Sequence, residues 1–231
     1  MRWLLYPFAA LLGLITIGLA VVALAVAFAW PTLPSLEALT DYHPKIPLRV
    51  YTADGALIGE YGEERRAVVA IQDVPPIMKN AILTAEDDRF YQHGGIDYTG
   101  ILRAAGANLI GGGKRQGAST ITQQVARNFF LSREKTLLRK LKEVFLAWHI
   151  EKELSKDEIL ELYLNKIMLG YRAFGVGAAA QVYYGKRVDQ LTLGEMAVIA
   201  GLPKAPSLLN PIRSPQRAQA RRNVVLMRML E

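Results

Sequence analysis

The pattern of apolar and polar residues along the chain begins with one long apolar run. No charged side chain occurs from Trp3 to Trp30, where Leu, Ala, Val and Ile dominate. As a helix this run would reach roughly 42 Å, which exceeds the ~30 Å hydrocarbon core of a bilayer. Secretory signal peptides have shorter apolar regions, of about 7–15 residues. We therefore predict an uncleaved transmembrane anchor at residues 1–30; the small residues of "ALAVAFA" leave a cleaved signal as the alternative.

A linker and a small β element are expected after the apolar run. The segment "PTLPSLEALTDYHPKIP", residues 31–47, contains four prolines and is typical of a linker. The next segment, "LRVYTADGALIGEYGEERRAVVAI", has the composition of two or three short strands, and Asp54-Gly55 is a strong hairpin-turn signal. We predict that the folded domain begins with these strands and occupies residues 48–231.

From "DVPP" to the end of the chain the pattern is helical. Good N-cap residues mark expected helix starts at Asp97, Ser119, Ser155 and Thr192. The chain is therefore predicted to be mainly α, with a small N-terminal β element. The expected helices are 76–87, 97–109, 119–130, 134–153, 155–164, 174–184, 192–201 and 214–230.

The helix expected at 134–153 has a regular apolar face. At 100° per residue, Glu143 lies about 160° from the centre of that face, between two basic residues. Periodicity alone therefore predicts that Glu143 belongs to an exposed i,i+4 ion pair. The apolar face itself is expected to lie in the core, and its residues are Leu137, Leu141, Val144, Phe145 and Trp148.

Charge and cysteine content narrow the possible partners. A formal net charge of +7 beside a membrane favours anionic headgroups or a phosphate-bearing ligand. Arg2 before the apolar run, and Glu37 and Asp41 after it, favour a cytoplasmic N-terminus and a folded domain outside. Nucleic acid is a poor partner for a domain placed there. The chain has no cysteine, which excludes disulfides and metal–thiolate sites.

Two segments suggest binding chemistry. In "AILTAEDDRFYQHGG", Glu86, Asp87 and Asp88 follow an apolar helical run, although the helix dipole favours acids at the opposite end. Further along, the glycine-rich loop "GGGKRQGAS" precedes the helix expected at 119–130. Backbone N–H groups at that helix start, with Lys114, would suit an anion. A flexible surface loop has the same composition, so both interpretations stay open.

Five segments in chain order resemble the five motifs of the peptidoglycan glycosyltransferases, the family that also forms the N-terminal module of class A penicillin-binding proteins. These segments are "EDDRFYQHGG", "GASTITQQVARNFF", "RKLKE", "KDEILELYLNKIMLG" and "GVGAAAQVYYGK". The resemblance covers about residues 45–231, and its flanks are similar to the bifunctional class A type. Because the chain stops inside a predicted helix, we expect a fragment that lacks the transpeptidase domain.

The resemblance implies a fold, a reaction and a location. The fold would be a lysozyme-like, two-lobed glycosyltransferase domain preceded by one transmembrane helix. The reaction would be polymerisation of lipid II by inverting glycosyl transfer, with Glu86 as general base on the acceptor GlcNAc 4-hydroxyl and undecaprenyl diphosphate leaving the donor. The chain would be a single-pass protein of the bacterial inner membrane, with its catalytic domain on the periplasmic face.

The resemblance also implies which residues form the site. Glu143 corresponds to the family's second acid, in the donor site, beside basic residues whose charges suit a diphosphate. Arg127 stands where many relatives have Lys, which keeps the charge but changes the geometry. The expected substrate-binding residues are Asp87, Phe90, His93, Lys114, Ser119, Thr120, Gln123, Gln124, Arg127, Asn128, Arg139 and Lys140.

No organic cofactor is implied. A divalent cation, Mg²⁺ or Mn²⁺, held by Glu143 would suit a diphosphate, although the sequence has no independent metal signature. The expected partners are lipid II and the growing glycan strand, the bacterial inner membrane, regulators of cell-wall synthesis and a moenomycin-type inhibitor; nucleic acid is not expected.

Two other functions are compatible with parts of the pattern. A lysozyme-like glycan hydrolase would also use carboxylates, but it would not need the basic residues beside Glu143. A non-catalytic membrane scaffold of cell-wall assembly would not need the acids at Glu86 and Glu143.

Overall fold

Helices make up most of the chain, as the hydrophobic periodicity predicted. The computed structural model describes residues 2–29, 31, 33–40, 47–55, 57–110, 117, 119–131 and 136–230. Each helix expected from the sequence is present, with its ends within three residues of the prediction. The helices are α1 (Arg2–Ala29), α2 (Glu37–Thr40), α3 (Pro76–Glu86), α4 (Tyr98–Ile110), α5 (Ile121–Phe130), α6 (Leu137–Glu153), α7 (Lys156–Lys166), α8 (Val176–Tyr184), α9 (Leu193–Gly201) and α10 (Pro215–Leu230).

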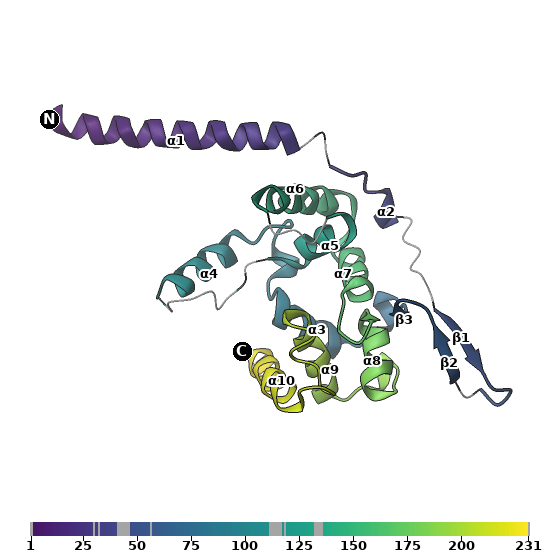
Figure 1. The fold of residues 1–231 in the computed structure, drawn as a ribbon. Coiled ribbons are helices and arrows are strands. Elements are labelled where there is room, and N and C mark those ends of the chain that lie inside the picture. Colours follow the sequence, from purple (N-terminus) through teal and green to yellow (C-terminus); the bar gives the residue numbers. More distant parts are fainter. Residues whose placement is uncertain are drawn as a thin grey trace.

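The N-terminal segments differ partly from the expectation. Figure 1 shows α1 as one long helix, and it contacts α6 of the helical body. No helix within the described residues is both long enough and apolar enough to span a membrane, so the anchor predicted at residues 1–30 stays a prediction of the sequence. The predicted linker contains α2, and Leu39 of that helix is buried.

Two small sheets are present in the described part of the chain. Strands β1 (Leu48–Tyr51) and β2 (Leu57–Tyr61) pair antiparallel, as the Asp54-Gly55 turn signal predicted. Strands β3 (Arg65–Arg66) and β4 (Ala173–Phe174) pair in parallel and join segments that are far apart in the sequence. The β4 strand was not predicted, because two residues are too few to show a period of two.

The core lies where α3, α5, α7, α8 and α9 meet. Fully buried residues come from each of these helices, including Met78 of α3, Val125 of α5, Leu160 of α7 and Ile199 of α9. Helix α10 packs along α9 and α3, and α5 packs against both α6 and α7 (Figure 1). This packing places the C-terminal end of α3 between α5 and α10.

The prediction for α6 was wrong about which face is buried. Glu143 is 1% exposed, whereas Leu137 is 87% and Trp148 42% exposed. The buried face consists of Glu143, Leu146, Ala147 and Ile150. Helix α6 packs this face on α5, while much of the apolar face stays open. Arg139 and Lys140 of α6 itself pair with the buried Glu143, and Lys140 also bonds to Gln123 of α5.

Side chains fix the helix starts largely as expected. Ser155 and Thr192 form capping boxes at α7 and α9, and Asp97 accepts the Gly100 N–H at the start of α4. Ser119 was the wrong cap for α5. Thr120 takes that role and accepts the Gln123 N–H at 3.2 Å.

Candidate active site

Glu86 is the last residue of α3. The helix ends there because Asp87 leaves the helical conformation, at φ −160° and ψ 78°. The side-chain amide of Gln124 donates a 2.9 Å hydrogen bond to Glu86 Oε2. Burial raises the pKa of Glu86; the Gln124 bond, Arg221 and Arg127 oppose the rise, and Asp87 adds to it. A raised pKa makes this carboxylate a better proton acceptor than an ordinary exposed one, so it suits proton abstraction.

Glu86 faces a cleft of about 290 Å³ whose rim is strongly basic. Of its cationic residues, the sequence had suggested only Arg127 as a site residue. Arg103, Lys204, Arg221 and Arg228 were missed, because α4 and α10 meet the cleft only through tertiary packing. One signal was available: Arg221 and Arg228 are seven residues apart and share one face of a predicted helix. The lining residues are Thr84, Ala85, Glu86, Asp87, Asp88, Arg103, Gly117, Ser119, Gln124, Arg127, Lys204, Arg221 and Arg228.

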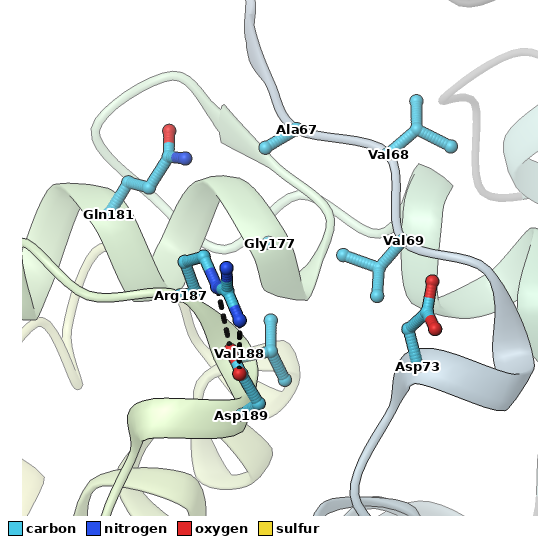
Figure 2. A pocket seen from close by; sticks show the side chains of 9 residues that line it. All are labelled: Ala67, Val68, Val69, Asp73, Gly177, Gln181, Arg187, Val188 and Asp189. Carbon is cyan, nitrogen blue, oxygen red and sulfur yellow. Dashed lines mark hydrogen bonds and ion pairs between the residues drawn. The ribbon is translucent and has the colours of Figure 1, made fainter.

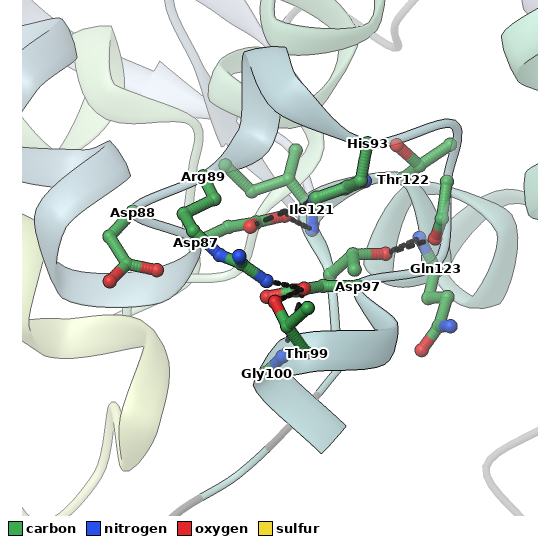
Figure 3. Close-up of polar contacts among 12 residues, drawn as sticks. Asp87, Asp88, Arg89, His93, Asp97, Thr99, Gly100, Ile121, Thr122 and Gln123 are labelled. Carbon is green, nitrogen blue, oxygen red and sulfur yellow. Dashed lines mark hydrogen bonds and ion pairs between the residues drawn. The ribbon is translucent and has the colours of Figure 1, made fainter. Parts of the chain in front are cut away.

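Asp87 is buried and bonds to the protein rather than to the cleft. Its carboxylate accepts the backbone N–H of Ile121 at 2.9 Å, at the start of α5. It also contacts His93 Nε2 at 3.0 Å. Figure 3 shows Asp87 between the loop that carries His93 and the start of α5. Asp87 therefore joins the end of α3 to α5 and to the loop that follows Glu86.

A second polar cluster surrounds the buried Glu143. Arg139 and Lys140 both pair with its carboxylate, and Lys140 Nζ lies 3.0 Å from Glu143 Oε2. The same ammonium group donates to Ser119 Oγ at 3.0 Å and to Gln123 Oε1 at 2.9 Å. Burial lowers the pKa of Lys140 to about 8, and its basic neighbours contribute to the shift.

Helix α5 connects the two acids that the sequence singled out. Its consecutive residues Gln123 and Gln124 reach in different directions: Gln124 bonds to Glu86, and Gln123 bonds to Lys140, the partner of Glu143. Ser119 lines the Glu86 cleft and bonds to Lys140 as well. The two clusters are therefore neighbouring parts of one polar region.

Other predicted site residues lie outside the cleft. Phe90 is 1% exposed and belongs to the hydrophobic core, so it shapes its loop instead of offering a binding surface. Thr120 is buried and donates to the Gly95 carbonyl at 2.7 Å. Asn128 is half-buried and is not among the residues that line the cleft. Lys114 lies outside the described residues.

Tyr163 is fully buried and interacts electrostatically with Glu86. Its hydroxyl has no hydrogen-bond partner within the part of the chain that the structure describes. Burial raises the pKa of Tyr163 well above its ordinary value, and the Glu86 charge adds to this effect. The hydroxyl group therefore stays protonated at neutral pH.

The residues around Glu143 do not fit a divalent cation. Both carboxylate oxygens already pair with the cations of Arg139 and Lys140, and a metal ion would have to displace these charges. Asp87, Asp88 and Asp97 do come within 4.8 Å of one another. Asp87 contacts His93, Asp88 pairs with Arg103, and Asp97 pairs with Arg89, so the positions of these acids are explained without an ion.

A second hollow, of about 530 Å³, lies between the segment after β3 and α8. Figure 2 shows Arg187 and Asp189 paired with each other at its edge. None of the residues that line the Glu86 cleft lines this hollow, and we assign no function to it.

Comparison with known proteins identifies the class to which this fold and site belong. The sequence model of the Transglycosylase family matches residues 54–230. The chain therefore belongs to the transglycosylase family, in agreement with the resemblance of its five motifs.

Two relatives of high identity are both penicillin-binding proteins 1A. Penicillin-binding protein 1A of Escherichia coli (strain K12) is 65% identical over 201 residues, which cover 87% of this chain and 24% of the relative. Penicillin-binding protein 1A of Neisseria cinerea is 54% identical over 224 residues, which cover 97% of this chain and 28% of the relative. The chain thus spans about a quarter of the length of these curated relatives.

A solved structure is also similar. The crystal structure of penicillin-binding protein 1A from Haemophilus influenzae matches 81% of this chain and 18% of its own chain, at 38% identity and a TM-score of 0.44.

Proposed function

We propose that this chain is a peptidoglycan glycosyltransferase module of a class A penicillin-binding protein, and that it polymerises lipid II into glycan strands. The observation that carries the proposal is the placement of Glu86. A carboxylate with a raised pKa faces a cleft whose other charged residues are mostly cations. Membership of the transglycosylase family supports the same reaction.

Glu86 would act as the general base. It would take the proton of the acceptor GlcNAc 4-hydroxyl while that oxygen attacks C1 of the donor sugar. The bond from C1 to undecaprenyl diphosphate breaks, and the configuration at C1 is inverted in one displacement. The Gln124 amide fixes the orientation of the carboxylate, and Asp87 fixes the backbone at the next position.

The cluster around Glu143 would hold the donor diphosphate. Charge that develops on the leaving group needs preorganised donors. Lys140, Arg139 and Arg127 supply the positive charge that would stabilise the leaving group. Glu143 holds Lys140 and Arg139 in place from its buried position. We assign Glu143 to this positioning task and derive no step through a metal ion.

The remaining cations of the cleft would bind the acceptor. Lipid II carries its own diphosphate, which must stay outside the donor site while its 4-hydroxyl approaches Glu86. Arg103, Lys204, Arg221 and Arg228 line the cleft and come from α4, the 3-10 turn Leu202–Lys204 after α9, and α10. Guanidinium groups suit phosphate oxygens because their donors form a planar fork.

Membrane attachment through residues 1–30, with the domain on the periplasmic face of the inner membrane, belongs to the same proposal. Its support is the uncharged run from Trp3 to Trp30 and the need to reach a lipid-linked substrate. Carbonate extraction of membranes tests it: the chain should stay in the pellet, and a chain without residues 1–30 should be released. Release of both chains by carbonate would contradict the anchor.

The decisive experiment incubates the detergent-solubilised chain with lipid II and separates the products on a gel. Wild type should produce glycan polymer, and a moenomycin-type phosphoglycolipid should inhibit it. Glu86→Gln should lower the rate by a factor of about 10² or more, because the base is lost. Glu153→Gln, at an exposed acid, is the matched control and should have the wild-type rate.

Other outcomes would favour the alternatives. Shortening of preformed glycan without polymerisation would indicate a hydrolase. A chain that binds lipid II but turns over neither substrate would indicate a scaffold. Polymerisation by Glu86→Gln at the wild-type rate would show that Glu86 is not the base.

A further inference from the structure

Lys156 and Glu151 form a partly buried ion pair at the junction of α6 and α7. Lys156 Nζ lies 2.7 Å from Glu151 Oε1, and the two side chains are 21% and 10% exposed, respectively. Neither residue lines the cleft that contains Glu86. Lys156 is the first residue of the fourth motif and Glu151 lies outside the motifs, and neither was predicted as a site residue.

Each of the two charges lies at the end of its own helix where the helix dipole disfavours it. Lys156 is the first residue of α7, where a cation meets the positive end of the helix dipole. Glu151 lies in the last turn of α6, where an anion meets the negative end. The stability of the two helices therefore does not explain these residues, and their contacts with the rest of the chain must.

Those contacts lead to the loop that follows Glu86. Lys156 Nζ donates a 2.6 Å hydrogen bond to the backbone carbonyl of His93 and lies 4.4 Å from the centre of the Phe90 ring. Glu151 accepts a 2.5 Å hydrogen bond from Thr122 of α5. The pair thus ties the loop from Phe90 to Gly95 to α5, α6 and α7 at once.

The loop in turn determines where Asp87 lies. The His93 ring contacts the Asp87 carboxylate, which also accepts the Ile121 N–H. Asp87 is the residue directly after Glu86, so a displacement of His93 would move the end of α3 that carries the proposed base.

We propose that Lys156 and Glu151 are positioning residues for the glycosyl transfer: they hold the His93 loop, and through His93 and Asp87 they fix Glu86 relative to the acceptor hydroxyl. This inference rests on the proposed function for its effect on rate. The position of His93, through which the pair would affect the rate, can be measured without any enzymatic reaction.

The first test compares variants in the lipid II assay. Lys156→Met should lower kcat by about 10- to 100-fold with less than about threefold change in KM, because small displacements of a reacting group act on the chemical step. Glu151→Gln should lower kcat in the same direction. Lys156→Arg keeps the charge and the donors and should recover most of the lost rate.

A matched control separates positioning from loss of stability. Lys186 pairs with Glu195 at 2.7 Å and lies outside the cleft. Lys186→Met removes an ion pair of the same length that is more exposed, at 38% and 19%, so it should lower the melting temperature by no more than Lys156→Met does and leave kcat unchanged. If both variants lose the same fraction of kcat, the effect is one of stability and the inference is wrong.

Histidine-selective NMR provides the second test. The chain has three histidines, and a His93→Gln variant identifies the His93 imidazole signal. This signal should shift in Lys156→Met and stay in place in Lys186→Met. Either a wild-type kcat or an unshifted His93 signal in Lys156→Met would overturn the inference. If the wild-type chain fails to polymerise lipid II, the proposed function falls, and the NMR comparison alone decides whether the pair places His93.

Discussion

The side-chain amide of Gln124 donates a hydrogen bond to the Glu86 carboxylate over 2.9 Å, from α5 to the end of α3. This bond lowers the pKa of Glu86 and opposes the effect of burial. The base must be ionised to act, so the rate should rise with pH through the pKa of Glu86. The balance between burial and this hydrogen bond therefore sets the pH at which the rate begins to fall on the acidic side of the pH–rate profile.

Replacement of Gln124 by Ala should move that acid side to higher pH. Without the hydrogen bond the ionised form of Glu86 loses a stabilising contact, and its pKa rises further. We expect about a tenfold loss of kcat/KM at acidic pH and a smaller loss at alkaline pH. Gln216→Ala, at an exposed position of α10, is the control. An equal loss at every pH would mean that Gln124 does not act through the pKa of Glu86.

Lys140 should determine the alkaline side of the profile. Its pKa is about 8, so its ammonium group loses the proton as the pH rises through that value. The donor diphosphate would then lose a cation, and KM for lipid II should rise above pH 8. Lys140→Arg stays charged and should extend activity to higher pH. Lys142→Met, on another face of α6, should retain the wild-type profile, and a KM of wild type that is constant from pH 7 to 9 would refute the assignment.

Arg221 should contribute to acceptor binding. It lines the cleft, and the Glu86 charge opposes the lowering of its pKa by burial. Arg221→Met should lower kcat/KM by about 10- to 100-fold, the effect of a lost hydrogen bond to a charged group. Arg217→Met, one turn earlier on α10 and exposed, is the matched control. Steady-state kinetics with varied lipid II would contradict the role if both variants behave alike.

Gly95 should tolerate no side chain. Its φ is +84°, and a Cβ atom there would lie 3.0 Å from the carbonyl oxygen of Ala147 on α6. Gly95→Ala should destabilise the fold by about 1–3 kcal/mol, because backbone strain adds to the close contact. Gly94→Ala meets nothing within 4 Å and should be nearly neutral. Thermal unfolding of the two variants measures the difference, and equal melting temperatures would contradict the prediction.

The sequence predicted the elements well because their signals are local. Proline at the start of α3, the capping boxes of α7 and α9, and the Asp54-Gly55 turn each depend on residues within a few positions. The sequence also predicted Glu86 and Gln124 as site residues through their motifs. Their hydrogen bond was not predictable, because it joins positions 38 residues apart.

Helix α6 shows where periodicity misleads. Its apolar face looked like a core face, and Glu143 looked exposed, because period and polarity carry no information about what a neighbouring helix offers. Helix α5 offers Gln123, and Lys140 and Arg139 neutralise the buried acid. A buried charge with such partners outweighed the burial of Leu137 and Trp148, which stay exposed.

By itself, the sequence determined the helices, the hairpin, and the two acids that the motifs carry. Only the tertiary structure decided that α4, the turn after α9 and α10 supply cations to the Glu86 cleft, and that Lys156 reaches the His93 carbonyl 63 residues away. The physical reason is the range of the interactions. Caps, turns and periodicity act within one or two helical turns, whereas charges and buried hydrogen bonds act between surfaces that become neighbours only when the core packs.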